Sequence, residues 1–232
     1  MWMKSLTNLS LRQGAQALGQ RDRHLGRILD RLGPPPLWGR RPGFSALVRI
    51  ILEQQVSLAA AKSLFLRVHR HLGGMTAEIV CAVGQAGLRE LGLTRQKARY
   101  CHELAARVLE GRLDLSAVAA LPDAVGRSML LAVPGLGPWS VDIYYLMALR
   151  RPDVWPDGDL ALASALKEVK RMDHLPTREH QRAIAARWTP WRSIAARLLW
   201  AHYLAARGQY ASAPGRLSEA SKNRLTLPQG ET

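Results

Sequence analysis

The chain has 232 residues, 47% of them hydrophobic, which is enough for one large domain or two small ones with a real core. It carries 33 Lys and Arg against 18 Asp and Glu, so the net charge of +15 predicts a polyanionic partner, either nucleic acid or an anionic membrane surface. No run reaches the ~18 apolar residues of a membrane span, and the N-terminus lacks the apolar stretch of a secretory signal. We therefore expect a cytoplasmic protein with no membrane partner.

In chain order, residues 1–20 have few apolar anchors and are predicted to be loose. Apolar residues at helical spacing then predict helices up to residue 206, and residues 208–232 are predicted to be a disordered tail. Sustained period-two alternation with β-branched residues is not seen, so the expected fold is all-α. The helices are expected over 22–32, 44–55, 58–72, 76–86, 94–109, from 116, from 123, 139–149, 160–172, 177–188 and 191–206.

The two cysteines, Cys81 and Cys101, do not form a CxxC pair, and no zinc or iron–sulfur ligand set completes them. They are best interpreted as two buried thiols in a reducing compartment.

The most informative stretch is the Pro-Gly-Leu-Gly-Pro turn at residues 134–138. Gly135 and Gly137 permit positive φ and a close approach of the backbone. A turn of this kind, just before a helix, leaves amide N–H groups that can bind an anion. An ordinary corner between two helices is the alternative, but the apolar helices on both sides and the basic chain favour phosphate binding.

Asp159 follows Gly158 and precedes Leu160, at the predicted start of a helix. An aspartate there is a plain N-cap, and its ionised form is favoured by the helix dipole. A carboxylate that stays ionised can stabilise a sugar cation or orient a water molecule. Spacing alone leaves Asp142, Asp153 and Asp157 as competitors.

Together these motifs resemble the helix-hairpin-helix, Gly/Pro/Asp superfamily of DNA base-excision glycosylases, and within it the 3-methyladenine DNA glycosylase II (alkylation repair) family. The resemblance covers about residues 22–206 in family order. The segments that carry it are IILEQQVSLAAAKSL (50–64), LGLTRQKARYCHELA (91–105), VPGLGPWSVDIYYLMAL (133–149), WPDGDLAL (155–162) and RWTPWRSIAARLLW (187–200).

The resemblance implies a role for each matching residue. Asp159 is the expected catalytic carboxylate, although the loop from Pro156 appears one residue longer than in a familiar bacterial member, which leaves Asp157 as an alternative. The base pocket is expected to contain Trp139, Trp200, Ile143 and Tyr144. Ile143 departs from the aromatic residue of the family pattern. Contacts with DNA are expected from Gln55, Ser57, Pro134, Gly135, Leu136, Gly137 and Ser140.

Gln55 matches the side chain that wedges into the duplex where the base leaves. The carbonyls of Leu131, Val133 and Leu136 match positions that hold a monovalent cation, Na⁺ or K⁺, and no other cofactor is implied. Bifunctional members carry a lysine where this chain has Trp139, and a tryptophan cannot form a Schiff base. The resemblance therefore implies a monofunctional, hydrolytic glycosylase without lyase activity.

We expect a monomer that acts on double-stranded DNA with a damaged base at the nucleoid. The domain at 21–207 should have two helical subdomains, 21–55 with 160–207 and 56–150, and an active-site cleft between them. Three alternatives remain: a glycosylase for deaminated bases such as uracil or hypoxanthine, a non-catalytic helix-hairpin-helix DNA-binding module, and a structural helical protein with a basic face.

Overall fold

The structure is a computed structural model, and it describes residues 5–210. Every regular element in this part of the chain is a helix, so the prediction of an all-α fold is confirmed. None of these helices is both long and apolar enough to cross a membrane. The elements are α1 (Asn8–Arg21), α2 (Arg23–Leu32), α3 (Phe44–Glu53), α4 (Leu58–Leu72), α5 (Ala77–Glu90), α6 (Arg95–Leu109), α7 (Leu115–Ala120), α8 (Asp123–Leu131), α9 (Pro138–Ile143), the π-helix η1 (Tyr144–Ala148), α10 (Leu160–Lys170), α11 (Arg178–Ala186) and α12 (Arg192–Ala206).

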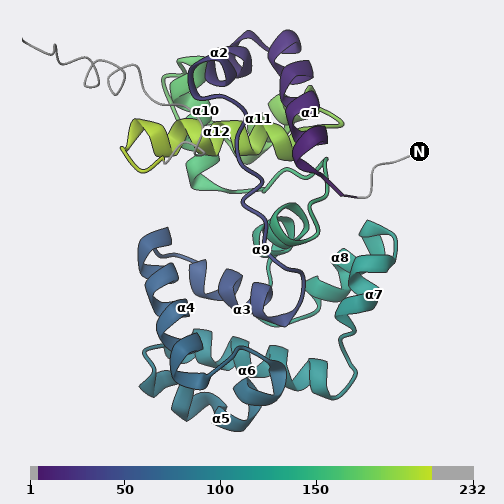
Figure 1. The fold of residues 1–232 in the computed structure, drawn as a ribbon, viewed down its shortest axis with the longest axis vertical. Helices are drawn as coiled ribbons and strands as arrows, with labels where there is room; N and C mark the ends of the chain where they lie inside the picture. Colours follow the sequence, from purple (N-terminus) through teal and green to yellow (C-terminus); the bar gives the residue numbers. More distant parts are fainter. Residues whose placement is uncertain (1–4, 211–232) are drawn as a thin grey trace, which may run out of the picture.

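The helices gather into two lobes with α9 between them (Figure 1). In one lobe α12 packs against α1, α2, α10 and α11, and in the other α3 packs against α4 and α6 while α5 pairs with α6. The chain passes between the lobes through residues 33–43, which contain three consecutive prolines, and again through residues 149–159. This second crossing places Asp159 beside α9.

The observed lobes differ from the expected subdomains in the placement of α3. Residues 21–55 were expected to pack together with 160–207, but α3 lies in the other lobe against α4 and α6 (Figure 1). The reason is its composition, because α3 is apolar on nearly every side and needs partners all round. Its buried residues are Ala46, Leu47, Val48, Ile50, Ile51, Leu52 and Glu53.

The prediction that residues 1–20 are loose is wrong for residues 8–20, which belong to α1, while residues 1–4 lie outside the described part of the chain. Thr7 and Ser10 make a reciprocal capping box at the start of α1. The helix packs closely against α12 because Gly14 has no side chain: a Cβ there would lie 2.4 Å from the Ile194 side chain. Of the predicted tail, residues 208–210 are described, with the Tyr210 ring edge-on to Trp38, and residues 211–232 lie outside the described part.

The continuous helix predicted for residues 139–149 is instead two pieces. After α9 the chain widens into the π-helical turn η1, in which the Leu149 amide donates to the Tyr144 carbonyl at 3.1 Å. Wider turns of this kind often mark functional sites. The buried Arg197 of α12 donates to the Leu146 carbonyl of this turn at 3.0 Å, which ties the turn to the other lobe.

Candidate active site

The predicted phosphate-binding turn is a tight hairpin between α8 and α9. The Leu136 amide donates to the Val133 carbonyl at 3.1 Å and closes the turn. Gly135 has φ +90, and a Cβ on it would lie 2.3 Å from the Tyr100 ring, so only glycine fits. Gly137 has φ −83 and open space where a Cβ would stand. As the N-cap of α9 it offers no capping side chain, so the first amides after Pro138 have no side-chain cap, and phosphate binding there stays a prediction.

Asp159 is the N-cap of α10 and accepts three hydrogen bonds. The Leu162 amide donates to its Oδ1 at 2.9 Å, as the N-cap interpretation predicted. The Trp139 indole Nε1 donates to Oδ2 at 3.0 Å, and the Trp200 indole Nε1 donates to Oδ1 at 3.3 Å. The structure thus brings together a carboxylate and two tryptophans that lie up to 61 residues apart in the sequence. Asp159 is 9% exposed, so these donors act on it in a largely dry environment.

The three competing aspartates are each engaged in an ion pair. Asp153 pairs with Arg192 at 2.8 Å, Asp157 with Arg182, and Asp142 with Arg127. Burial raises the pKa of the Asp142 carboxyl, and the hydrogen bond and charge of Arg127 oppose that rise. Asp159 has no such cation partner among the described residues and receives neutral donors instead. Its catalytic role stays a prediction.

Ile143 and Tyr144 lie in the core, and the Tyr144 hydroxyl accepts from the Gly43 amide at 3.0 Å. Their role in a base pocket stays a prediction. Gln55 is exposed with φ +57, and Ser57 caps α4 by accepting from the Ala60 amide at 3.2 Å. Because Gln55 and Ser57 are both exposed, they are accessible to DNA, and their contact with DNA also stays a prediction.

Ser140 is only 2% exposed, and its expected contact with DNA stays a prediction. Its hydroxyl accepts from Gln54 Nε2 at 2.9 Å, and the same amide donates to the Gly135 carbonyl at 2.8 Å. Ser140 therefore supports the hairpin from inside. Gln54 was missed because the sequence has two adjacent glutamines at a helix end, and the spacing does not say which one turns inward.

The carbonyls of Leu131, Val133 and Leu136 stay the predicted ligands of a monovalent cation. Val133 already accepts the Leu136 amide, but a carbonyl oxygen has a second lone pair and can still bind a cation. Among residues 5–210 no group of three or more His, Cys, Asp or Glu side chains could bind another metal.

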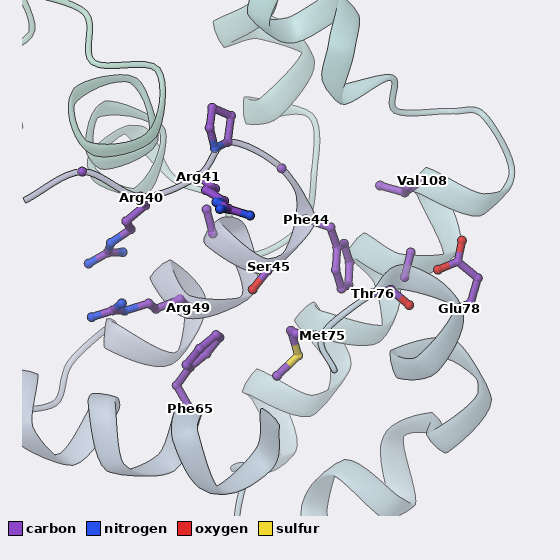
Figure 2. Close-up of a pocket in the computed structure, with 15 residues that line it drawn as sticks. Arg40, Arg41, Phe44, Ser45, Arg49, Phe65, Met75, Thr76, Glu78 and Val108 are labelled. Atoms are coloured by element: carbon purple, nitrogen blue, oxygen red, sulfur yellow. The ribbon is translucent and has the colours of Figure 1, made fainter. Parts of the chain in front are cut away.

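One hollow in the described part of the chain lies away from Asp159. It has a volume of about 590 Å³ and is formed by residues 39–46, Arg49, Phe65, 75–78 and Val108 (Figure 2). Arg40 and Arg49 share a single carboxylate, that of Glu53, at 2.8 and 3.1 Å. The expected cleft at Asp159 is not this hollow, and the active-site cleft stays a prediction.

The hairpin, the aspartate at the helix start and the two-lobed helical fold define a class of DNA repair protein. The chain belongs to the HhH-GPD superfamily of base excision DNA repair proteins, whose family model matches residues 48–190.

Two proteins with similar sequences agree with this family membership. The chain is 27% identical over 165 residues to the putative DNA-3-methyladenine glycosylase YfjP of Bacillus subtilis, covering 68% of this chain and 58% of that protein. It is 30% identical over 189 residues to DNA-3-methyladenine glycosylase 2 of Escherichia coli, covering 74% of this chain and 63% of that protein. The chain thus spans less than two thirds of the length of these relatives.

Solved structures agree in fold. The crystal structure of a DNA-3-methyladenine glycosidase from Bacillus halodurans superposes with a TM-score of 0.71 at 25% identity, over 85% of this chain and 92% of that one. The Schizosaccharomyces pombe glycosylase Mag1, solved in complex with abasic DNA, gives 0.71 at 22% identity over 81% and 95%. At 22% identity, the similarity to Mag1 shows the fold alone.

Proposed function

We propose that this protein is a monofunctional DNA glycosylase that hydrolyses the N-glycosidic bond of alkylated purines, such as 3-methyladenine and 7-methylguanine, in double-stranded DNA. The observation that carries the proposal is the Asp159 carboxylate held by the indoles of Trp139 and Trp200. The names of its relatives in Bacillus subtilis and Escherichia coli support the same substrate class. We further propose that it acts as a monomer on nucleoid DNA.

The hairpin and the carboxylate have separate tasks in this mechanism. Backbone amides at Gly137 and the start of α9 hold a phosphate, while the damaged nucleotide turns out of the stack. An alkylated purine already carries positive charge and leaves readily, so the sugar develops oxocarbenium character. Asp159 stabilises that cation and orients the attacking water.

The indole faces suit the same substrate. A cationic purine is attracted to an electron-rich ring by about 0.5–2 kcal/mol. Because both indole N–H groups point to Asp159, each ring is fixed by a hydrogen bond at one edge and can offer a face to the base. Neutral purines gain less from such a site, which favours alkylated over normal bases.

The chemistry should stop at base release. Strand cleavage requires an amine that attacks the sugar, and the position that would supply it is Trp139. Its indole nitrogen donates to Asp159 and has no basic lone pair.

The test is release of free base from methylated duplex DNA, with heat-labile and direct strand breaks scored separately. We expect release of 3-methyladenine or 7-methylguanine without direct breaks. The Asp159→Asn variant should lose at least about a hundredfold in the single-turnover rate, within the range for a catalytic acid–base group. It should keep its affinity for DNA. Asp153→Asn, which alters the ion pair with Arg192, is the matched control. Release by wild type from uracil or hypoxanthine DNA alone would reassign the substrate, and normal release by Asp159→Asn would overturn the catalytic role.

A further inference from the structure

The loop that carries Asp159 is attached to α9 at two points, and the second of these has no role in the mechanism above. Trp139 and Asp142 lie three residues apart and so share one face of α9. Trp139 donates to the Asp159 carboxylate. Asp142 Oδ2 accepts from the backbone amide of Asp157 at 3.2 Å, two residues before Asp159.

Asp142 is unusual for a carboxylate, because it is 4% exposed. Its other oxygen, Oδ1, accepts from the Arg127 guanidinium of α8. A buried carboxylate is costly unless it is fully paired, and replacing such a pair with apolar residues is often neutral for stability. Stability alone therefore gives little reason for a charged group at this position.

The contacts of Asp142 give a different reason for a buried charge at this position. Arg127 comes from α8 and Asp142 from α9, so the ion pair joins the two helices of the DNA-binding hairpin. The same carboxylate then fixes the loop at the Asp157 amide, and Asp157 is itself held by Arg182 of α11 through Oδ1 at 3.1 Å. One chain of contacts thus runs from the hairpin, through Asp142, to the loop that ends in the catalytic carboxylate.

We infer that Asp142 is a positioning residue: it fixes the 156–159 loop to the DNA-binding hairpin, so that the Asp159 carboxylate is aligned with the sugar that the hairpin presents. This inference rests on the proposed function, since alignment has meaning only if Asp159 acts on a sugar. A misplacement of about 1 Å can reduce a rate about a hundredfold, so such an attachment is worth the cost of a buried charge.

The test uses two variants of the full chain. Asp142→Ala removes both contacts, whereas Asp142→Asn keeps one oxygen that can accept the Asp157 amide and replaces the oxygen that accepts from Arg127 with an NH2 donor. The matched control is Asp22→Asn. Asp22 likewise accepts from a tryptophan indole, Trp188 at 3.0 Å, and pairs with Lys170 at 3.2 Å, but it belongs to the other lobe and does not contact the loop.

Two readouts separate positioning from stability. The first is the pair of indole N–H resonances of Trp139 and Trp200 in the protein without DNA, assigned from their tryptophan-to-phenylalanine variants. The second is the single-turnover rate of base release at saturating enzyme, beside the dissociation constant for the same DNA. A merely structural residue would change the unfolding midpoint but neither readout in the folded protein.

We expect Asp142→Ala to shift both indole resonances and to slow base release by about tenfold or more, with the dissociation constant changed by no more than about twofold. Asp142→Asn should have a smaller effect in the same direction, and Asp22→Asn should have none on either readout. If Asp142→Ala does not fold, Asp142→Asn decides the matter by the same two readouts.

Unmoved resonances, or shifted resonances with an unchanged rate, would overturn the inference. Should wild type release no base from any substrate, the proposed function fails instead. The attachment of the loop can still be tested in that case. A shift of the Trp139 resonance in Asp142→Asn but not in Asp22→Asn would support the attachment, and an unshifted Trp139 resonance in Asp142→Asn would refute it.

Discussion

At the scale of single residues, the Asp159 site depends on two hydrogen bonds whose donors are also the aromatic surfaces. The indole N–H groups of Trp139 and Trp200 donate to the carboxylate, and in the proposed function their ring faces contact the base. Phenylalanine separates the two tasks, because it keeps an aromatic face and lacks the N–H donor.

We expect Trp139→Phe and Trp200→Phe each to slow base release by about tenfold or more, since a hydrogen bond to a charged group contributes about 1.5–3 kcal/mol. Affinity for DNA should change little, which fluorescence anisotropy with abasic duplex would show. Trp188→Phe is the control. The Trp188 indole donates to the Asp22 carboxylate at 3.0 Å, the same distance as from Trp139 to Asp159, but it lies away from the site. Trp188→Phe should reduce stability and leave the rate of base release unchanged. An equal loss of rate in all three variants would mean that the indoles of Trp139 and Trp200 do not act specifically on Asp159.

The two hairpin glycines should respond differently to alanine. Gly135→Ala meets the Tyr100 ring and a positive φ, so the free energy of unfolding should fall by about 1–3 kcal/mol. Gly137→Ala meets neither, so its unfolding midpoint should match wild type. Its methyl group would, however, occupy the space through which a phosphate reaches the amides. A several-fold weaker dissociation constant with unchanged stability is therefore expected, and unchanged affinity would place the phosphate elsewhere.

At the scale of elements, the end of α3 is attached to the hairpin. Lys97 of α6 donates to the Leu52 carbonyl at 2.7 Å, which caps the last turn, and Gln54 reaches from there to Gly135 and Ser140. The exposed segment 55–58 that follows is thus held at one end by the hairpin itself. Insertion of Gln55 into the duplex and phosphate binding by the hairpin are expected to depend on this contact.

Gln54→Ala should weaken binding to abasic duplex and reduce the fluorescence gain of 2-aminopurine placed next to the lesion, which reports loss of stacking. Its effect on single-stranded substrate should be smaller, because no base pair has to open there. Gln55→Ala is the comparison: it removes the side chain expected to insert into the duplex and leaves the attachment, so it should reduce the 2-aminopurine signal and not the binding of single-stranded substrate. If Gln54→Ala affects single and double strands equally, the contact serves the hairpin and not the wedge.

At the scale of the whole molecule, Arg197 of α12 connects the lobes. It is fully buried, and its Nη2 donates to the Leu146 carbonyl of η1. Burial lowers the pKa of the Arg197 guanidinium to about 9, with the nearby charge of Arg150 acting in the same direction. The unfolded chain binds the proton more tightly, so the buried charge reduces stability below pH 9, and stability from this group rises as the pH increases from about 9 toward the ordinary arginine pKa.

Arg197→Met removes the charge and keeps most of the volume, so at neutral pH its free energy of unfolding should be within about 1.5 kcal/mol of wild type. Arg197→Ala loses the same hydrogen bond to the Leu146 carbonyl and leaves a cavity in addition, so it should lose about 3 kcal/mol. Urea denaturation at pH 7 measures both. A methionine variant as unstable as the alanine variant would mean that the hydrogen bonds of Arg197, and not its volume, hold the lobes together.

The sequence by itself determined the helical class, the hairpin and the position of Asp159, because each depends on local chemistry. Apolar spacing, N-capping side chains and a positive φ at Gly135 act over a few residues and leave a readable pattern. The membership of the chain in a base-excision repair superfamily also follows from ordered local motifs.

Only the tertiary structure decided which groups meet. Residues 1–20 appeared too polar to be ordered, yet α1 packs on α12 because Gly14 permits close contact. Which of four aspartates lacked a cation partner depended on arginines at distant positions, and Gln54 turned inward while Gln55 remained exposed because of where the hairpin lies. Such pairings join residues tens of positions apart, and local sequence patterns contain no information on them.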